Sequence, residues 1–142
     1  MAHQVYVFDK IKVFFKHTDY YGVVHPYNYL EWMSHARESY FQDLVPDFHK
    51  ICEQRIKMVT FKVDLEYLED ARFGDEIGIK IYAEKVKKLS FDVIFEFYNS
   101  ITNKVLARGC QTLTFLDGVT MRPTTIPDEL KNVVLKYEKV CG

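Results

Sequence analysis

The sequence predicts an α+β fold in which a five-stranded antiparallel sheet wraps round one long helix. Apolar residues alternate with period two in five segments and recur at spacings of three and four in one longer segment. The connections between the last four predicted strands are short, which favours antiparallel pairing. Such a sheet has one apolar face to cover, and the predicted helix is long and apolar enough to cover it. The chain is therefore expected to form a single domain over residues 1–142.

The first predicted strand spans residues 5–15, and its apolar side chains fall on odd positions. Asp9 and Lys10 interrupt this alternation, so an irregularity is expected there. A long helix should follow from Pro26 to about Asp43. Proline suits the first turn of a helix because the N–H that it lacks would have no partner inside the helix.

The predicted helix has an apolar face and a polar face. Residues at spacings of three and four form the apolar face: Tyr29, Leu30, Met33, Ala36, Tyr40, Phe41 and Leu44. The polar face is expected to be solvated, and consists of Glu31, His35, Glu38 and Gln42. Arg37 is expected to lay the apolar stem of its side chain along the core.

Four more strands and up to two short helices complete the predicted elements. The strands cover residues 59–67, 77–83, 91–97 and 105–116, joined by loops or turns at 70–75, 85–88 and 100–103. A short helical piece is an option within 47–54. A closing helix should run from about Pro127 to Tyr137, with Pro127 in its first turn.

Composition and charge exclude several classes of protein. Nineteen basic and twenty acidic residues leave a formal charge of −1, so the basic surface of a nucleic-acid-binding protein is missing. The N-terminus lacks the pattern of an export signal, and no apolar window is long enough to span a membrane. The three cysteines, Cys52, Cys110 and Cys141, are odd in number and widely spaced, which indicates reduced, buried thiols and a cytoplasmic location.

The segment that joins the first strand to the helix holds the candidate chemistry. It places the carboxylate of Asp19 close to a helix start, where unpaired backbone N–H groups can stabilise a developing oxyanion. Asp19 has two interpretations, because Asp-Tyr-Tyr-Gly is also a good type I turn in which the side chain binds its own backbone. His25 is the expected N-cap, either as an ordinary loop histidine or as a weak cap that leaves donors available.

Other types of site find little support in the sequence. His17 and Asp19 have no third ligand at a useful interval, so no metal is expected, and no cofactor-binding or nucleophile-elbow motif is present. Lys85, Lys87 and Lys88 form the densest basic cluster. This cluster is either a solvated turn or a contact for a phosphate-bearing ligand.

Two motifs resemble one enzyme family. Thr18-Asp19-x-x-Gly22-Val23-Val24-x-x-x-Asn28-Tyr29, followed by the helix, and Ala71-Arg72-Phe73-Gly74-Asp75-Glu76 resemble the hotdog-fold acyl-CoA thioesterases of the 4-hydroxybenzoyl-CoA thioesterase and YbgC type. The resemblance extends from about Val5 to Leu130. It implies a homodimer or homotetramer that associates edge to edge, with active sites at the interface between copies.

The resemblance also implies roles for individual residues. The family's catalytic aspartate falls on Asp19, as nucleophile or general base. Substrate contacts fall on Gly22, Val24, Tyr29, Lys87, Lys88 and Ser90. The backbone amide that polarises the thioester carbonyl falls on Pro26, which has no N–H, so the donor is expected at Tyr27 or His25.

We therefore predict a thioester hydrolase that acts on an acyl-CoA or an acyl-carrier thioester. Two alternatives stay open at this point: a hotdog enoyl-CoA hydratase or dehydratase that uses His17 or His25, and a non-catalytic acyl-carrier-binding module. Four tyrosines either surround an aromatic acyl group, line an aliphatic tunnel or simply pack the helix start: Tyr20, Tyr21, Tyr27 and Tyr29.

Overall fold

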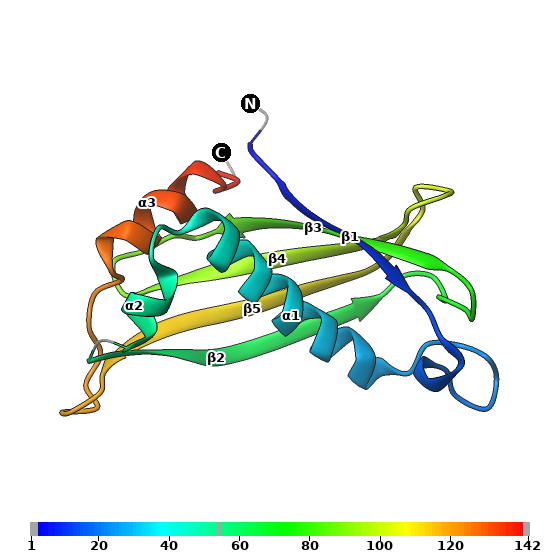
Figure 1. The fold of residues 1–142 in the computed structure, drawn as a ribbon, viewed down its shortest axis with the longest axis horizontal. Helices are drawn as coiled ribbons and strands as arrows, with labels where there is room; N and C mark the ends of the chain where they lie inside the picture. Colours follow the sequence, from blue (N-terminus) through cyan, green and yellow to red (C-terminus); the bar gives the residue numbers. More distant parts are fainter. Residues whose placement is uncertain (1–2, 54, 141–142) are drawn as a thin grey trace.

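The computed structural model describes residues 3–53 and 55–140, and it confirms the expected arrangement of sheet and helix (Figure 1). The strands are β1 (Tyr6–Lys12), β2 (Ile56–Tyr67), β3 (Glu76–Glu84), β4 (Ser90–Asn99) and β5 (Val105–Asp117). The helices are the 3-10 turn η1 (Phe15–His17), α1 (Pro26–Leu44), α2 (Phe48–Glu53) and α3 (Asp128–Lys136). All strand pairs are antiparallel, in the order β1-β3-β4-β5-β2.

Helix α1 lies across one face of the sheet and fills its core (Figure 1). Met33, Ala36 and Phe41 are fully buried, whereas Leu30 is 43% exposed, so the apolar stripe is narrower than predicted. The helix approaches β5 closely at Gly109, where an added Cβ would lie 2.7 Å from Cε of Met33. The polar face of α1 is exposed or half-buried, as expected.

The predicted irregularity in β1 is confirmed and changes which side chains face the core. Between the pairs Phe8–Ile79 and Ile11–Ile77, two residues of β1 oppose one of β3, and one of the two, Lys10, has φ 64°. Because a bulge reverses the alternation of side chains, Phe8 packs on the core before it and Ile11 after it. The odd-numbered Val7 is therefore 48% exposed. Phe15 lies beyond the strand, in η1.

The consecutive strands β2 and β3 are not neighbours, which corrects the pairing expected from short links. β2 pairs with β5 at one edge of the sheet, and β3 lies between β1 and β4. The link between them, residues 68–75, therefore crosses the end of the sheet. The amides of Leu68 and Glu69 both donate to the carbonyl of Leu106, and Ala71 accepts from the amide of Val24 at 2.8 Å. This crossing link supports the loop that precedes α1.

Smaller differences concern the short helices and the cysteines. Pro127 is the N-cap of α3 rather than part of its first turn. Cys52 is exposed on α2 rather than buried, Cys110 is half-buried, and Cys141 lies outside the described residues. Within the described ranges, no helix is long and apolar enough to cross a membrane.

Candidate active site

The carboxylate of Asp19 is held by the turn that follows it. Its Oδ1 accepts hydrogen bonds from the amides of Tyr21 at 2.8 Å and Val23 at 3.2 Å. The turn closes through the amide of Gly22, which donates to the carbonyl of Asp19 at 3.0 Å. No described residue donates to Oδ2. The two sequence interpretations of Asp19 are therefore compatible, because one oxygen shapes the turn and the other remains available to a ligand.

Helix α1 begins beside this turn. His25 caps the helix: its Nδ1 accepts from the amide of Tyr27 at 3.4 Å. The amide of His25 itself donates to the carbonyl of His17 at 2.9 Å, and so does the side chain of Asn28 at 2.7 Å. Of the two amides expected as oxyanion donors, that of His25 is thus committed to a normal bond. The amide of Tyr27 makes only a long hydrogen bond.

Asp19 borders a shallow depression of about 300 Å³, which Val24, Pro26, Tyr29 and Tyr67 also line. The rings of Tyr29 and Tyr67 lie 5.7 Å apart. Burial, and then the nearby Tyr67 and carboxylates, raise the pKa of Tyr29, so its hydroxyl stays protonated at neutral pH. The carboxylates of Glu69 and Asp70 line the same depression as Asp19. Gly22 shapes the turn, with φ 76°, but does not line the depression.

Of the two histidines that a hydratase could use, His17 is engaged in the turn before the helix. Nδ1 of His17 accepts a hydrogen bond from the amide of Phe14 at 2.9 Å. Burial, and then the charge of Lys16, lower the pKa of His17 below its usual value. Its ring also packs edge-on against Trp32, with centroids 5.3 Å apart. His17 therefore acts as a neutral part of the η1 turn.

The predicted phosphate contacts lie far from Asp19 in the same chain. Lys87 and Lys88 are exposed and Ser90 is half-buried, in the link between β3 and β4 and at the start of β4. This link lies near the C-terminal end of α1, since Phe91 packs against Phe41 with centroids 6.3 Å apart. Helix α1, of 19 residues, is about 28 Å long. One chain therefore does not bring these residues to Asp19.

A buried polar cluster between α1 and the sheet was not predicted. Arg37, whose side chain is only 13% exposed, donates to Oε1 of Gln111 at 3.0 Å and to Oγ1 of Thr60 at 3.1 Å. Gln111 is 3% exposed. The cluster joins α1 to β5 and the edge strand β2. The alternation of β5 places Gln111 on the inner face of the sheet. A glutamine at a core position was therefore the signal in the sequence for a buried polar cluster.

Comparison with known proteins identifies the family. The family model described as "Thioesterase-like superfamily" matches residues 13–134. The chain belongs to the thioesterase-like superfamily. The sheet that wraps round α1 is therefore the hotdog fold expected of these thioester hydrolases.

The relatives of this thioesterase-like protein have named activities. It is 24% identical over 122 residues to the acyl-CoA thioesterase YbgC of Haemophilus influenzae, which covers 85% of this chain and 88% of that one. It is 28% identical over 129 residues to the 1,4-dihydroxy-2-naphthoyl-CoA hydrolase of Prochlorococcus marinus, with 86% and 84% covered.

Solved structures share the fold of the thioesterase-like chain. The dynemicin thioesterase superimposes with a TM-score of 0.87 at 22% identity, covering 97% of this chain and 100% of that one. A Staphylococcus aureus protein in complex with CoA gives 0.86 at 12% identity, with 100% and 90% covered.

Proposed function

We propose that this protein is an acyl-CoA thioesterase in which Asp19 is the catalytic carboxylate. The observation that supports this most is the geometry of Asp19 itself. Two backbone amides fix its Oδ1, and its Oδ2 is left to face a ligand beside the start of α1. Fixed placement of a catalytic group supplies much of the rate enhancement of an enzyme.

The chemistry needs one carboxylate and one oxyanion donor. As a general base, Asp19 takes a proton from water while the water oxygen bonds to the thioester carbon. The C–S bond then breaks and the thiolate leaves, taking up a proton to become the thiol. As a nucleophile, Asp19 forms an acyl anhydride first, which water hydrolyses. A thiolate leaves without strong acid assistance, so either route suits this site.

The amide of Tyr27 is the proposed oxyanion donor. It is the first N–H of α1 after Pro26, and its bond to Nδ1 of His25 is long enough, at 3.4 Å, to be exchanged at small cost. The carbonyl oxygen of the substrate would replace His25 as its acceptor when charge develops there. His25 then holds the donor in place between turnovers.

Association of two copies through β2 is the second part of the proposal. β2 is a twelve-residue strand at the sheet edge, opposite β1, with unpaired backbone groups along its outer side. Phe61, Val63 and Tyr67 on this strand are 76%, 43% and 50% exposed. A long apolar edge strand is a site for strand pairing. A second copy placed antiparallel there brings its Lys87, Lys88 and Ser90 toward Asp19, where they would bind CoA phosphates.

The test compares Asp19→Asn with the unaltered protein on a panel of aliphatic and aromatic acyl-CoA esters and one acyl-carrier thioester. Thiol release should fall about 10²–10⁴-fold, because asparagine keeps the turn acceptor but not the base. Asp9→Asn, an exposed carboxylate in the β1 bulge, is the control. Near-normal hydrolysis by Asp19→Asn contradicts the role of Asp19.

The same panel separates the alternatives. Enoyl-CoA hydration without thioester cleavage would identify a hydratase, and tight binding without turnover would identify a binding module. A cytoplasmic location stays a prediction from the cysteine pattern.

A further inference from the structure

The depression beside Asp19 carries an excess of negative charge. Its wall includes three carboxylates, those of Asp19, Glu69 and Asp70. Among the described residues, no lysine, arginine or histidine lines it. A sphere with its volume of about 300 Å³ is about 8 Å across, so a group bound inside lies within about that distance of all three carboxylates.

Two cations pair with these carboxylates, but neither lines the depression. Nζ of Lys104 lies 3.3 Å from Oε1 of Glu69, and Nη2 of Arg72 lies 3.5 Å from Oδ2 of Asp70. The side chains of Lys104 and Arg72 are 63% and 59% exposed, so water screens both pairs. The cations therefore offset the negative potential of the depression only in part.

A buried tyrosine also lines the depression. Tyr29 is 2% exposed, and no described residue hydrogen-bonds its hydroxyl. A buried hydroxyl without a partner in the protein depends on water or a ligand for its hydrogen bond. Tyr29 is thus available to a group bound beside Asp19, and this observation, independent of the charges, indicates that the depression takes a ligand.

The first atoms of the acyl group share the depression with the thioester carbonyl. In a malonyl thioester the carboxylate carbon is two bonds from the thioester carbon, a distance of about 2.5 Å. This distance does not depend on the path that a longer acyl group takes away from the site. A carboxylate so close to the thioester therefore stays among the three carboxylates for as long as the carbonyl is bound at Asp19.

We infer that Glu69 and Asp70 determine specificity: they disfavour acyl groups that carry a carboxylate next to the thioester and so favour uncharged acyl groups. Like charges repel, and the depression offers no cation to offset the charge of such an acyl group. The inference rests on the proposed thioesterase function, with the substrate carbonyl at Asp19. It adds that the link after β2 selects the substrate by charge.

The test compares two acyl-CoA esters of nearly the same shape. The isopropyl group of isovaleryl-CoA resembles the carboxylate of malonyl-CoA in shape but has no charge. Both esters contain the same CoA, so the malonyl-to-isovaleryl ratio of kcat/KM reports the acyl group alone. Glu69→Gln and Asp70→Asn should each raise this ratio about threefold, and the double variant about tenfold, the effect of single charges about 8 Å away at a dielectric constant between those of a protein surface and water.

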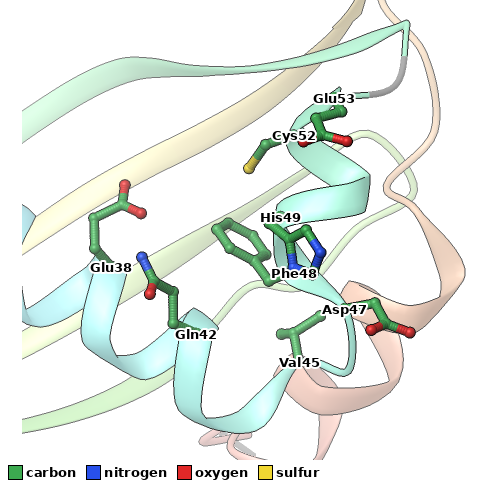
Figure 2. Close-up of a pocket in the computed structure, with 8 residues that line it drawn as sticks. All are labelled: Glu38, Gln42, Val45, Asp47, Phe48, His49, Cys52 and Glu53. Carbon is green, nitrogen blue, oxygen red and sulfur yellow. The ribbon is translucent and has the colours of Figure 1, made fainter.

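Asp47→Asn is the matched control for Asp70→Asn. Asp47 lines a hollow at the opposite end of α1 (Figure 2). Its side chain is 65% exposed, against 64% for Asp70, and it too pairs with an exposed cation, Lys50, at 3.9 Å. Asparagine also tolerates the φ of 53° at this position. The two substitutions remove the same charge from similar surroundings, and only Asp70→Asn should change the ratio.

Two further measurements change the electrostatic field and leave the carboxylates in place. Lys104→Gln removes the cation paired with Glu69, so the ratio should fall by about twofold to threefold. Raising the salt concentration from about 0.01 M to about 1 M shortens the Debye length from about 30 Å to about 3 Å. The ratio should therefore rise with salt in the unaltered protein, and rise less in the double variant.

The failures of the two proposals are distinguishable. Both esters are also measured as competitive inhibitors of the ester that the protein cleaves fastest, so the ratio is obtained even if neither is a good substrate. If the unaltered protein cleaves no thioester of the panel, the proposed function fails. If it cleaves thioesters but Glu69→Gln and Asp70→Asn shift the ratio no more than Asp47→Asn does, the inference alone is overturned. A loss of folded protein lowers both rates in proportion and leaves the ratio as it was.

Discussion

Replacing Gly22 by alanine tests how strongly the turn controls Asp19. Gly22 has φ 76°, a left-handed conformation that residues with a Cβ disfavour. Nothing lies within 4 Å of the position that its Cβ would take, so the whole cost arises from the backbone angle. Gly74, in the link between β2 and β3, has φ 89° and equally open surroundings. Gly74→Ala is therefore a matched control.

The cost of each alanine is about 1–2 kcal/mol of unfolding free energy. For a chain of 142 residues the entropy of unfolding is about 0.3 kcal/mol/K, so each substitution should lower Tm by roughly 3–7 °C. The two variants should differ in activity. A relaxed φ at residue 22 displaces the amides of Tyr21 and Val23 that hold Oδ1 of Asp19, and a displacement of about 1 Å can cost 10²-fold in rate.

Differential scanning calorimetry and acyl-CoA hydrolysis measure these two effects on the same samples. We expect similar losses of Tm for both variants. We also expect a fall in kcat of at least about tenfold for Gly22→Ala alone, a conservative part of the range for misplaced catalytic groups. Equal activity of the two variants at equal Tm would refute the argument that this turn positions the proposed catalytic carboxylate.

Three further results are expected. Backbone amides of the following turn, together with an arginine, lower the pKa of Asp117 from 3.8 to about 2. The ionised carboxylate therefore stabilises the fold, and this stabilisation is lost as the pH falls from 3.8 towards 2. Acid unfolding followed by circular dichroism should be less steep in Asp117→Asn. Burial and nearby carboxylates raise the pKa of Cys110 to about 11, so mass spectrometry after alkylation at pH 8 should show faster modification of the exposed Cys52. Arg37→Met should cost about 1–3 kcal/mol in urea unfolding because Oε1 of the buried Gln111 loses its donor, and adding Gln111→Leu should recover part of that loss.

Most elements were predictable because their patterns are local. Period-two alternation located four strands within a few residues, and the spacing of Tyr29, Met33, Ala36 and Tyr40 located α1. The bulge in β1 was predictable as an interruption. Its effect on Val7 was not, because the number of inserted residues decides which side chains turn outward, and that depends on pairing with β3.

Strand order was less predictable because pairing depends on contacts distant in sequence. The eight-residue link after β2 is compatible with a hairpin or with a crossing, and local pattern does not distinguish them. The crossing is stabilised by bonds from Leu68 and Glu69 to Leu106 and by the bond from Val24 to Ala71. The Arg37 cluster has the same origin, since its partners lie 23 and 74 residues away.

In the candidate site, too, contacts near in sequence were predictable and contacts distant in sequence were not. The turn at Asp19 and the cap at His25 involve neighbours within four residues, and both were predictable from residue types. The distance between Asp19 and Lys87 follows from the length of α1 and from the sheet order. No local pattern indicates that the two belong to opposite ends of one chain. The proposed function therefore needs a second copy to bring them together.

Pro26 removes an N–H at the position where the resemblance implies a donor, yet the local geometry limits the consequence. Proline with a fixed φ starts the helix, so the amide of Tyr27 becomes the first N–H of α1. The side-chain oxygen of a serine or aspartate at the N-cap would accept a short hydrogen bond from an amide of the first turn. His25 reaches the amide only at 3.4 Å. A proline followed by a residue with a free amide, and preceded by a poor cap, is therefore compatible with the proposed oxyanion donor at Tyr27.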